Sequence, residues 1–470
     1  MSIAIKGGNI FQNSRPFFDE KMKFPSLEEL TIINLRGIAE LWHLANVEDE
    51  FPAFPNSENP GDSDALFNNK VALPAIKHIK MSLVDGLQKI WGSHLDVRSF
   101  NELESLDIKF VEKATKAFSL DAIQRIRNLK ELNLQQFQLT GQFIERVGFY
   151  NDEVENSVLL PQLRNLKLDS FPQLKRIPWR ELTLQNLRCL QISEIHDLTY
   201  LFPASICKRL VNLEALRVYD CHKMKEIVRE ELGDANTVEV KVVFPHLNFL
   251  RLSNLPAFQS LGSDNVILEF PSIKEVDFDK FQNPILWDLL QKLKPVKELQ
   301  LGRCESLFEL HDLKGRSSTM LPRLRNLTLS YMDNLQRIPW MIFPIKNLRY
   351  LKISYIHGLK FLFTASMCSE GFAQLEEIHI QDCKDIEQML AQESIEDTSN
   401  NAAPITVVLP RVKIIKLYYL RSLRSFSSEN YEALEFPSLE EVEIKEYDKE
   451  YFDLNTVIKK RCTTRLCYAR

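Results

Sequence analysis

The chain has 470 residues, with 59 Lys or Arg against 64 Asp or Glu, a formal net charge of −5, and 44% hydrophobic residues. This near-neutral balance gives no electrostatic field suited to nucleic acid, so we expect no nucleic-acid partner. No run of about 20 apolar residues is present, so we also expect no membrane span. With 14 Gly and neither G-x-x-x-x-G-K-[S/T] nor G-x-G-x-x-G, the sequence lacks the common glycine-rich phosphate loops.

A short unit of the form L-x-x-L-x-L recurs along most of the chain. Residues 1–23 have no clear period, and we interpret them as an N-terminal lead-in. The first unit begins FPSLEELTI at Phe24, and a polar insert rich in Asn, Pro, Asp and Ser follows at 48–69, which is typical of a loop. About fifteen units follow one another at intervals of roughly 23–28 residues, the spacing of leucine-rich repeats.

A longer repetition lies on top of the short one. The stretch LPQLRNLKLDSFPQLKRIPW at Leu160–Trp179 returns as LPRLRNLTLSYMDNLQRIPW at Leu321–Trp340. We interpret residues 160–310 and 321–454 as an internal duplication. Gaps between units at about 145–158, 229–243 and 391–408 are expected to be loops, and residues 451–470 a basic C-terminal tail.

The unit has a geometric consequence. The last two apolar residues of L-x-x-L-x-L are two apart, so in a strand both point to the same side. Leu216 and Val218 are therefore expected to face inward. One such strand cannot bury its apolar side, whereas a stack of them can. The sequence predicts an α/β repeat over residues 24–450, a leucine-rich repeat solenoid shaped as a curved horseshoe, with a parallel β-sheet on the concave side and an irregular or short-helical convex side.

The cysteines and tryptophans fit this scheme. The eight cysteines are widely spread without C-x-x-C metal spacing, and we find no apolar signal peptide, so they are interpreted as reduced thiols in a cytoplasmic protein. Cys221, Cys304 and Cys383 follow strands at the position where this repeat takes Asn or Cys, and are expected to satisfy backbone groups there. The tryptophans stand near unit ends and are expected to be buried on the return side: Trp42, Trp91, Trp179, Trp287 and Trp340.

No constellation of catalytic residues is apparent. Neither H-E-x-x-H nor G-x-S-x-G occurs, and the nine histidines are scattered along the chain. Pairs of acidic residues recur at one position of the repeat, and we interpret them as solvated charges. We therefore expect no enzyme activity, no metal site and no cofactor.

The outward strand positions carry aromatic residues beside cations, a combination that protein interfaces enrich. The alternative is an irregular solvated face with chance aromatics, because scattered exposed apolar residues are normal. The candidate partner-binding residues on the concave face are Arg217, Tyr219, Phe249, Arg251, Tyr350, Lys352, Lys416 and Tyr418.

One run of residues resembles a known family. LFPASIC followed by LVNLEALRVYDCHKMKEIV, within Leu201–Val228, and its second version at Leu362–Leu390 are similar to the leucine-rich repeat region of plant intracellular, coiled-coil type nucleotide-binding disease resistance proteins. The resemblance extends from Phe24 to about Ile444. It implies a recognition and regulatory domain of plant innate immunity that senses pathogen effectors or modified host proteins and controls defence signalling. The implied protein partner is an effector, a guarded host protein or the nucleotide-binding module of a receptor.

The resemblance has limits. The sequence contains no phosphate-binding loop and no coiled coil, so nucleotide binding is not carried over. A portion of a larger receptor and a truncated relative acting alone both remain open. The other function considered is a substrate-binding leucine-rich repeat adaptor of a ubiquitin ligase. That function requires an F-box-like helical segment before the repeats, for which residues 1–23 are too short.

Overall fold

The computed structural model describes residues 1–6, 24–35, 65–68, 72–84, 89–92, 94–114, 117–139, 159–230, 239–281, 286–304, 321–338, 340, 343, 345–364, 367–368, 371–391, 405–427, 431–446 and 465–468. They form two compact units. The first comprises Met1–Leu247 with Ala257–Glu269, and the second Asn248–Pro256 with Phe270–Arg470.

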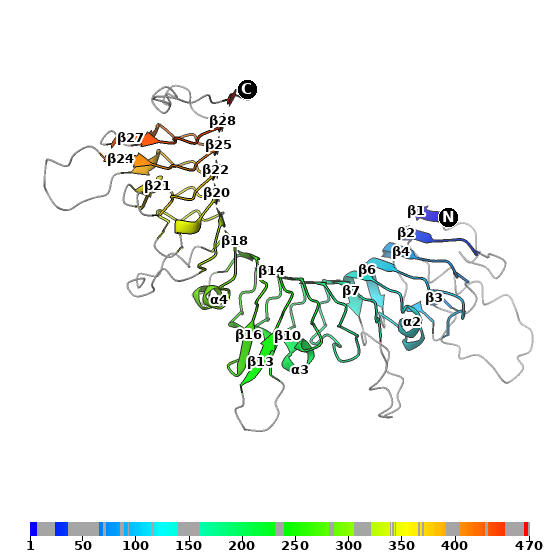
Figure 1. The fold of residues 1–470 in the computed structure, drawn as a ribbon. Coiled ribbons are helices and arrows are strands. Elements are labelled where there is room, and N and C mark those ends of the chain that lie inside the picture. Colours follow the sequence, from blue (N-terminus) through cyan, green and yellow to red (C-terminus); the bar gives the residue numbers. More distant parts are fainter. Residues whose placement is uncertain are drawn as a thin grey trace, which may run out of the picture. The chain divides into compact units, whose positions relative to one another are not determined.

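The first unit is built on a ladder of parallel strands (Figure 1). Each strand pairs with the next repeat's strand, so sequence neighbours are also neighbours in the sheet. In order, the strands are β1 (Ser2–Lys6), β2 (Glu29–Leu35), β4 (His78–Val84), β6 (Ser105–Ala114), β7 (Glu131–Leu139), β8 (Asn165–Asp169), β9 (Cys189–Ser193) and β11 (Ala215–Tyr219).

The second unit has a ladder of the same kind, in which equivalent repeat positions face each other without a register shift. Its strands are β14 (Phe249–Ser253), β17 (Glu275–Asp279), β18 (Glu298–Gly302), β19 (Asn326–Ser330), β20 (Tyr350–Ser354), β22 (Glu377–Gln381), β25 (Ile414–Tyr418), β28 (Glu441–Lys445) and β29 (Arg465–Tyr468).

Side chains alternate along the ladder strands as the repeat pattern predicts. Leu216 and Val218 are 2% and 0% exposed, while Arg217 between them is half-buried on the other side. The same alternation runs through β8, β19, β22, β25 and β28. Because inward positions stack on their equivalents in the neighbouring strands, the apolar sides of the strands from β2 to β28 are covered. The predicted parallel-sheet solenoid is confirmed.

A left-handed residue follows the outward positions of each ladder strand from β2 to β28. At the sixth position, counted from the strand's first residue, φ is positive; Tyr331 has φ 56° and Tyr419 has φ 58°. The backbone N–H there still donates to the next strand, as from Tyr331 to the Ser354 carbonyl at 3.1 Å. We call these residues the turn column; in the second unit they are Asn254, Lys280, Arg303, Tyr331, Tyr355, Asp382, Tyr419 and Glu446.

The three cysteines that follow ladder strands form hydrogen bonds with backbone groups, as predicted. The thiol of Cys221 donates to the Tyr219 carbonyl at 3.2 Å, and that of Cys304 to the Gly302 carbonyl at 3.1 Å. Cys383 repeats the arrangement with the Gln381 carbonyl at 3.4 Å. Burial raises the pKa of each of these thiols to about 12, so they remain protonated.

Tryptophans are buried on the return side of several repeats. Trp91, Trp179, Trp287 and Trp340 are 1–5% exposed, as expected, and Trp42 lies outside the described residues. The indole N–H of Trp179 donates to the Leu201 carbonyl at 2.6 Å, and that of Trp340 to the Leu362 carbonyl at 2.7 Å. The two copies of the duplication therefore share this buried hydrogen bond.

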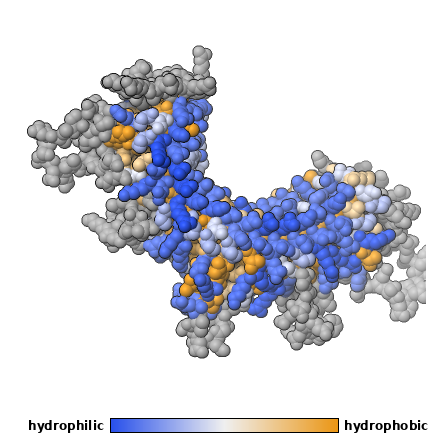
Figure 2. Space-filling view, in the orientation of Figure 1, coloured by the Kyte–Doolittle hydropathy of each residue, from blue (hydrophilic) through white to orange (hydrophobic). Residues whose placement is uncertain are grey.

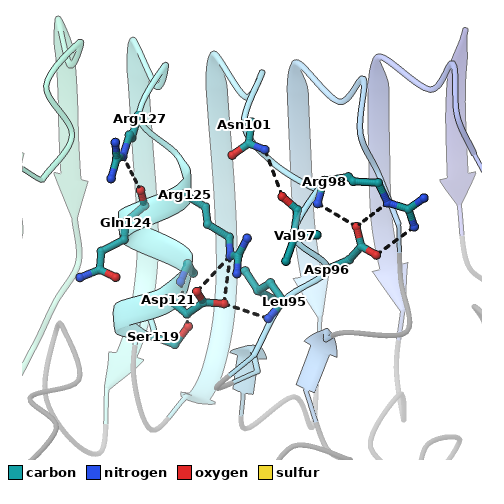
Figure 3. Close-up of polar contacts among 11 residues, drawn as sticks. Leu95, Asp96, Val97, Arg98, Asn101, Ser119, Asp121, Gln124, Arg125 and Arg127 are labelled. Atoms are coloured by element: carbon teal, nitrogen blue, oxygen red, sulfur yellow. Dashed lines mark hydrogen bonds and ion pairs between the residues drawn. The ribbon is translucent and has the colours of Figure 1, made fainter.

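The described helices are short and lie on the return side. α2 (Leu120–Arg125) begins at Ser119, whose hydroxyl accepts the Ala122 N–H at 3.2 Å. Asp121 accepts from the Leu95 N–H and from Arg125 (Figure 3), which ties the helix to the preceding loop. The others are α3 (Ala204–Cys207), α4 (Leu286–Lys292) and the 3-10 turn η4 (Ile345–Asn347). The longest has seven residues, far too few to reach across a bilayer.

Small parallel sheets on the return side go beyond the predicted irregular or short-helical convex side. The first unit has β3 (Ala65–Phe67) with β5 (Lys89–Trp91), β10 (Tyr200–Pro203) with β12 (Glu226–Arg229) and β15 (Ser260–Gly262), and β13 (Val240–Val243) with β16 (Val266–Glu269). The second has β21 (Phe361–Thr364) with β23 (Gln388–Ala391) and β26 (Ser425–Ser427), and β24 (Ile405–Val408) with β27 (Tyr431–Glu435).

Three segments that we expected to be loops thus contain strands, β3 within 48–69, β13 within 229–243 and β24 within 391–408. Val-rich sequences such as VKVV favour a strand once a partner strand is available, and that partner lies in the next repeat. Apolar residues gather over β13 and β16 in Figure 2, where Val243 and Ile267 are 38% and 44% exposed.

Both ladders extend into segments that we placed outside the repeats. β1 lies in the expected lead-in and pairs with β2, and β29 lies in the expected basic tail and pairs with β28. The limits of the solenoid at residues 24 and 450, and the extent of the duplication, stay predictions.

Candidate interaction surface

The outward side chains at the first, third and fifth positions of the ladder strands form what we call the ladder face. All eight predicted binding residues lie on it, and all eight are half-buried rather than fully exposed. They are distributed as Arg217 and Tyr219 on β11 in the first unit, and Phe249 and Arg251 on β14, Tyr350 and Lys352 on β20, and Lys416 and Tyr418 on β25 in the second unit.

Part of the predicted patch converges on a histidine that we did not single out. Lys352, His379 and Lys416 share one row of the sheet, on β20, β22 and β25. The hydroxyl of Tyr350 lies 3.1 Å from Nδ1 of His379, and the rings meet edge to face with centroids 5.0 Å apart. Burial lowers the pKa of His379 and outweighs the opposing carboxylate of Glu377. The imidazole therefore stays neutral between the two lysines.

A second convergence joins Lys416 and Tyr418 to Glu443. The Tyr418 hydroxyl donates to Oε2 of Glu443 at 2.5 Å, and Lys416 Nζ lies 4.0 Å from the same oxygen. Lys445 pairs with Oε1 at 2.6 Å and stands 5.0 Å from the Tyr418 ring centroid. Burial, followed by the contact with Glu443, raises the pKa of Tyr418 to about 12. The contacts with Lys445 and Tyr418 lower the pKa of Glu443.

The other predicted residues do not join this cluster. Arg251 pairs with Asp277 at 3.0 Å on the adjacent strand. Three strands separate β14 from β20, which is about 19 Å at the usual strand spacing. Arg217 and Tyr219 belong to the first unit. The structure thus unites Tyr350, Lys352, Lys416 and Tyr418, together with His379 and Glu443, and we call these six the His379 cluster.

The most exposed aromatic residues near the ladder face lie in the turn column, a row that we did not predict from the sequence. Tyr331 and Tyr419 are 46% and 41% exposed. Tyr331 stacks on Tyr355, and the Arg303 guanidinium lies 5.3 Å from its ring centroid. Arg303 is held in turn by two bonds to Asp279, Nε to Oδ1 at 2.9 Å and Nη2 to Oδ2 at 2.7 Å. Counting one residue beyond each strand would have found this row.

These surfaces carry binding groups rather than reactive ones. Within the described residues, no three His, Cys, Asp or Glu side chains approach closely enough to hold a metal ion. The described buried thiols have raised pKa values because burial disfavours the thiolate. What the ladder face and the turn column offer are aromatic rings and charges fixed by a rigid backbone, as in a protein-binding surface.

The strand ladders, the repeat period and the return-side tryptophans define a leucine-rich repeat solenoid. A family profile described as plant disease resistance protein RPS2-like, leucine-rich repeats, matches residues 75–222 and 247–384, more than half of the chain. The chain belongs to this family, which confirms the resemblance. Repeats of this kind typically serve protein interaction and are not catalytic.

The remaining comparisons add little. No curated protein sequence matches the chain. Among solved structures, a leucine-rich repeat protein from Bacteroides thetaiotaomicron has 13% identity and a TM-score of 0.19, over 77% of this chain and 55% of that one. The chain therefore spans about half the length of that protein, and a likeness this weak carries no argument about function.

Proposed function

We propose that this chain is the recognition and regulatory domain of a plant disease resistance receptor, acting in the cytoplasm. In this proposal it binds a pathogen effector, a modified host protein or the nucleotide-binding module of its own receptor, and so controls defence signalling. Family membership supports the class of protein.

The observation that carries the proposal is the His379 cluster. Two tyrosines and two lysines converge on a neutral histidine and an ionised glutamate, on three neighbouring repeats and one beyond. Tyrosine is enriched at binding hot spots because its ring fills a pocket while its hydroxyl makes one directed bond. Because sheet pairing holds the strands, little conformational entropy remains to be lost when a partner binds.

The turn column supports the same function. Tyr331, Tyr355 and Tyr419 stand at the edge of the same ladder, with Arg303 beside Tyr331. Burial of exposed aromatic rings beside an oriented guanidinium removes apolar surface from water, which favours the binding of a partner. A partner lying on the ladder face would meet this row at its rim.

The test is capture of partners from pathogen-challenged plant tissue, followed by binding measurements with each purified candidate. We expect the double variant, Tyr350→Ala combined with Tyr418→Ala, to weaken the binding of a true partner at least tenfold. The double variant should keep the melting temperature of the parent chain within a few degrees. The matched control is Val97→Ala with Val211→Ala, exposed at 71% and 42% and away from the ladder strands. Unchanged partner binding in the tyrosine variants would refute the assignment to this surface. Variants of Arg217 with Tyr219, and of Phe249 with Arg251, determine whether the other predicted residues take part.

A further inference from the structure

A groove lined by basic residues lies at the entry to three strands of the second unit. Its volume is about 500 Å³, and five of the eight lining residues are cations. None of the eight is acidic. The lining consists of Lys297, Pro322, Arg323, Arg325, Lys346, Asn347, Arg349 and Gln374.

The backbone fixes the spacing of these cations. Lys297, Arg325 and Arg349 immediately precede β18, β19 and β20, so we call this repeat position the pre-strand column. The carbonyl of Lys297 accepts from the N–H of Arg325 at 2.8 Å, and that of Arg325 from the N–H of Arg349 at 2.7 Å. The backbone positions of these three basic residues therefore recur at the strand spacing of about 4.8 Å.

The two remaining cations come from the turns that lead into β19 and β20. Arg323 is next to Pro322, and Lys346 is next to Asn347 in η4. The Asn347 amide donates to the Pro322 carbonyl at 3.0 Å and so binds the two turns together. The groove thus has a rigid frame with long basic side chains around it.

The pre-strand column is ion-paired in most other places. Acidic and basic residues of consecutive strands pair there, as Glu28 does with Lys77 at 3.2 Å, Glu104 with Lys130 at 2.8 Å, Arg188 with Glu214 at 3.4 Å, and Lys413 with Glu440 at 3.9 Å. In the groove, Arg349 has such a partner, Glu376 at 3.4 Å. For Lys297, Arg323, Arg325 and Lys346 the described part of the chain provides no ion pair.

The first copy of the duplication shows that the fold does not need two of these charges, although Lys130, Arg164 and Arg188 stand at the equivalent pre-strand positions. At the positions of Arg323 and Lys346 it carries Gln162 and Gln185. The bond between the turns is nevertheless kept, since the Asn186 amide donates to the Pro161 carbonyl at 2.8 Å. Same-sign charges held together without counter-ions repel one another and favour a bound anion. The cations of the second copy therefore point to a ligand.

The chemistry of the groove narrows the choice of ligand. No aromatic side chain lines it, whereas proteins that bind single-stranded nucleic acid hold the bases on aromatic rings. Guanidinium groups match the planar carboxylate with two parallel hydrogen bonds. The groove and the ladder face meet in the sequence, because Arg349 directly precedes Tyr350 of the His379 cluster.

We propose that this groove binds an acidic segment of a partner protein, with several Asp or Glu residues in succession. The class of partner rests on the protein-binding function proposed above, but the residues are separate from the ladder face. Binding at this site is electrostatic, so it weakens as salt rises.

The experiment uses the full chain and a fluorescent peptide of eight Glu residues flanked by Gly-Ser, followed by anisotropy in 50 mM and 300 mM salt. We expect the peptide to bind, and R323Q combined with K346Q, which restores the residues of the first copy, to weaken binding at least tenfold. The matched control K208Q with K223Q removes two exposed charges of the first unit and should change binding less than twofold. Melting temperatures of all variants are expected to agree.

Three results would overturn the proposal. The first is that the wild-type chain binds the Glu peptide no more tightly than a Gly-Ser peptide. The second is that the groove variant and the control variant weaken binding of the Glu peptide equally. The third is binding of tripolyphosphate, sensitive to R323Q and K346Q, without binding of the Glu peptide, which would make the groove a phosphate site. The proposed function is tested separately, with ladder-face variants and captured partners. A groove that does not bind the Glu peptide therefore leaves the proposed function standing. Loss of the proposed function would likewise leave the peptide-binding result unaffected.

Discussion

The ring of Tyr331 lies parallel to the ring of Tyr355, with centroids 4.6 Å apart and an angle of 2° between their planes. The two residues occupy the same turn-column position on consecutive repeats, so regular strand spacing brings the rings into contact. A stacked pair adds about 0.5–1.5 kcal/mol beyond the area it buries.

A double-mutant cycle measures this stack. Tyr331→Ala, Tyr355→Ala and the double variant should show a coupling of about 0.5–1 kcal/mol in denaturant unfolding. The control cycle pairs Tyr331 with Tyr419, two rungs further along than Tyr355, for which the effects should add. Additive effects in both cycles would mean that the stack contributes nothing to stability.

The buried tryptophans should differ in how much they stabilise the fold. Trp179→Phe and Trp340→Phe each remove an indole N–H that donates to a buried carbonyl, leaving that carbonyl unpaired at a cost of about 1–3 kcal/mol. Trp91 Nε1 is buried but has no hydrogen-bond partner within the described residues. Trp91→Phe is therefore expected to cost less, in chemical denaturation, than either of the others. An equal loss at all three positions would contradict this ranking.

Asp279 should be the most sensitive charged residue of the ladder face. It binds Arg303 through both oxygens and also accepts the Ser253 hydroxyl at 3.0 Å. Asp279→Asn is expected to cost about 1–2 kcal/mol, a figure reduced because Arg303 is partly in solvent. Asp197→Asn, which breaks an exposed contact with Lys223, should change the unfolding midpoint little. The opposite order would show that the Asp279 contacts are not stabilising.

His379 should make stability depend on pH. Burial lowers its pKa in the folded chain, so between that lowered value and the unfolded value of about 6.5 the unfolded chain binds more protons. The contribution of neutral His379 to the free energy of unfolding is therefore fully present above pH 6.5 and decreases as the pH falls through this window. Unfolding at pH 7.5 and 5.5 measures the effect, and His379→Gln should flatten it. A variant with the parent's full pH dependence would place the cause elsewhere.

Alkylation should discriminate among the described thiols. Cys207, Cys221, Cys304, Cys368 and Cys383 are buried, and burial raises the pKa of each to about 12. Cys189 is half-buried on β9 and should react first with iodoacetamide. Peptide mass spectrometry after a short exposure reads out the order. Early modification of Cys221 or Cys304 would indicate local opening of the repeat turn.

The scaffold was predictable because it depends on residue type at a fixed period. Leu216, Val218 and the cysteines after the strands follow from local spacing alone. The short return-side strands were missed because Val240–Val243 becomes a strand only through pairing with Val266–Glu269, which spacing within one repeat does not reveal.

The proposed interaction surface was only partly predictable. The outward placement of Tyr350, Lys352, Lys416 and Tyr418 was predictable because they alternate with the apolar residues. The histidine and the glutamate that connect them were not, since both look like ordinary solvent-facing residues in the sequence. Tyr331 and Tyr419 were missed because a left-handed residue after the strand breaks the alternation on which the search relied.

The unshifted register from β14 to β29 gives the ladder a metric property. Gain or loss of one whole repeat would move every later side chain by a single strand spacing, about 4.8 Å, without turning any of them inward. The distance between two outward residues on such a ladder can therefore change only in whole strand spacings. Unequal recombination within the duplicated repeats could retune that distance in steps, with no substitution in the core.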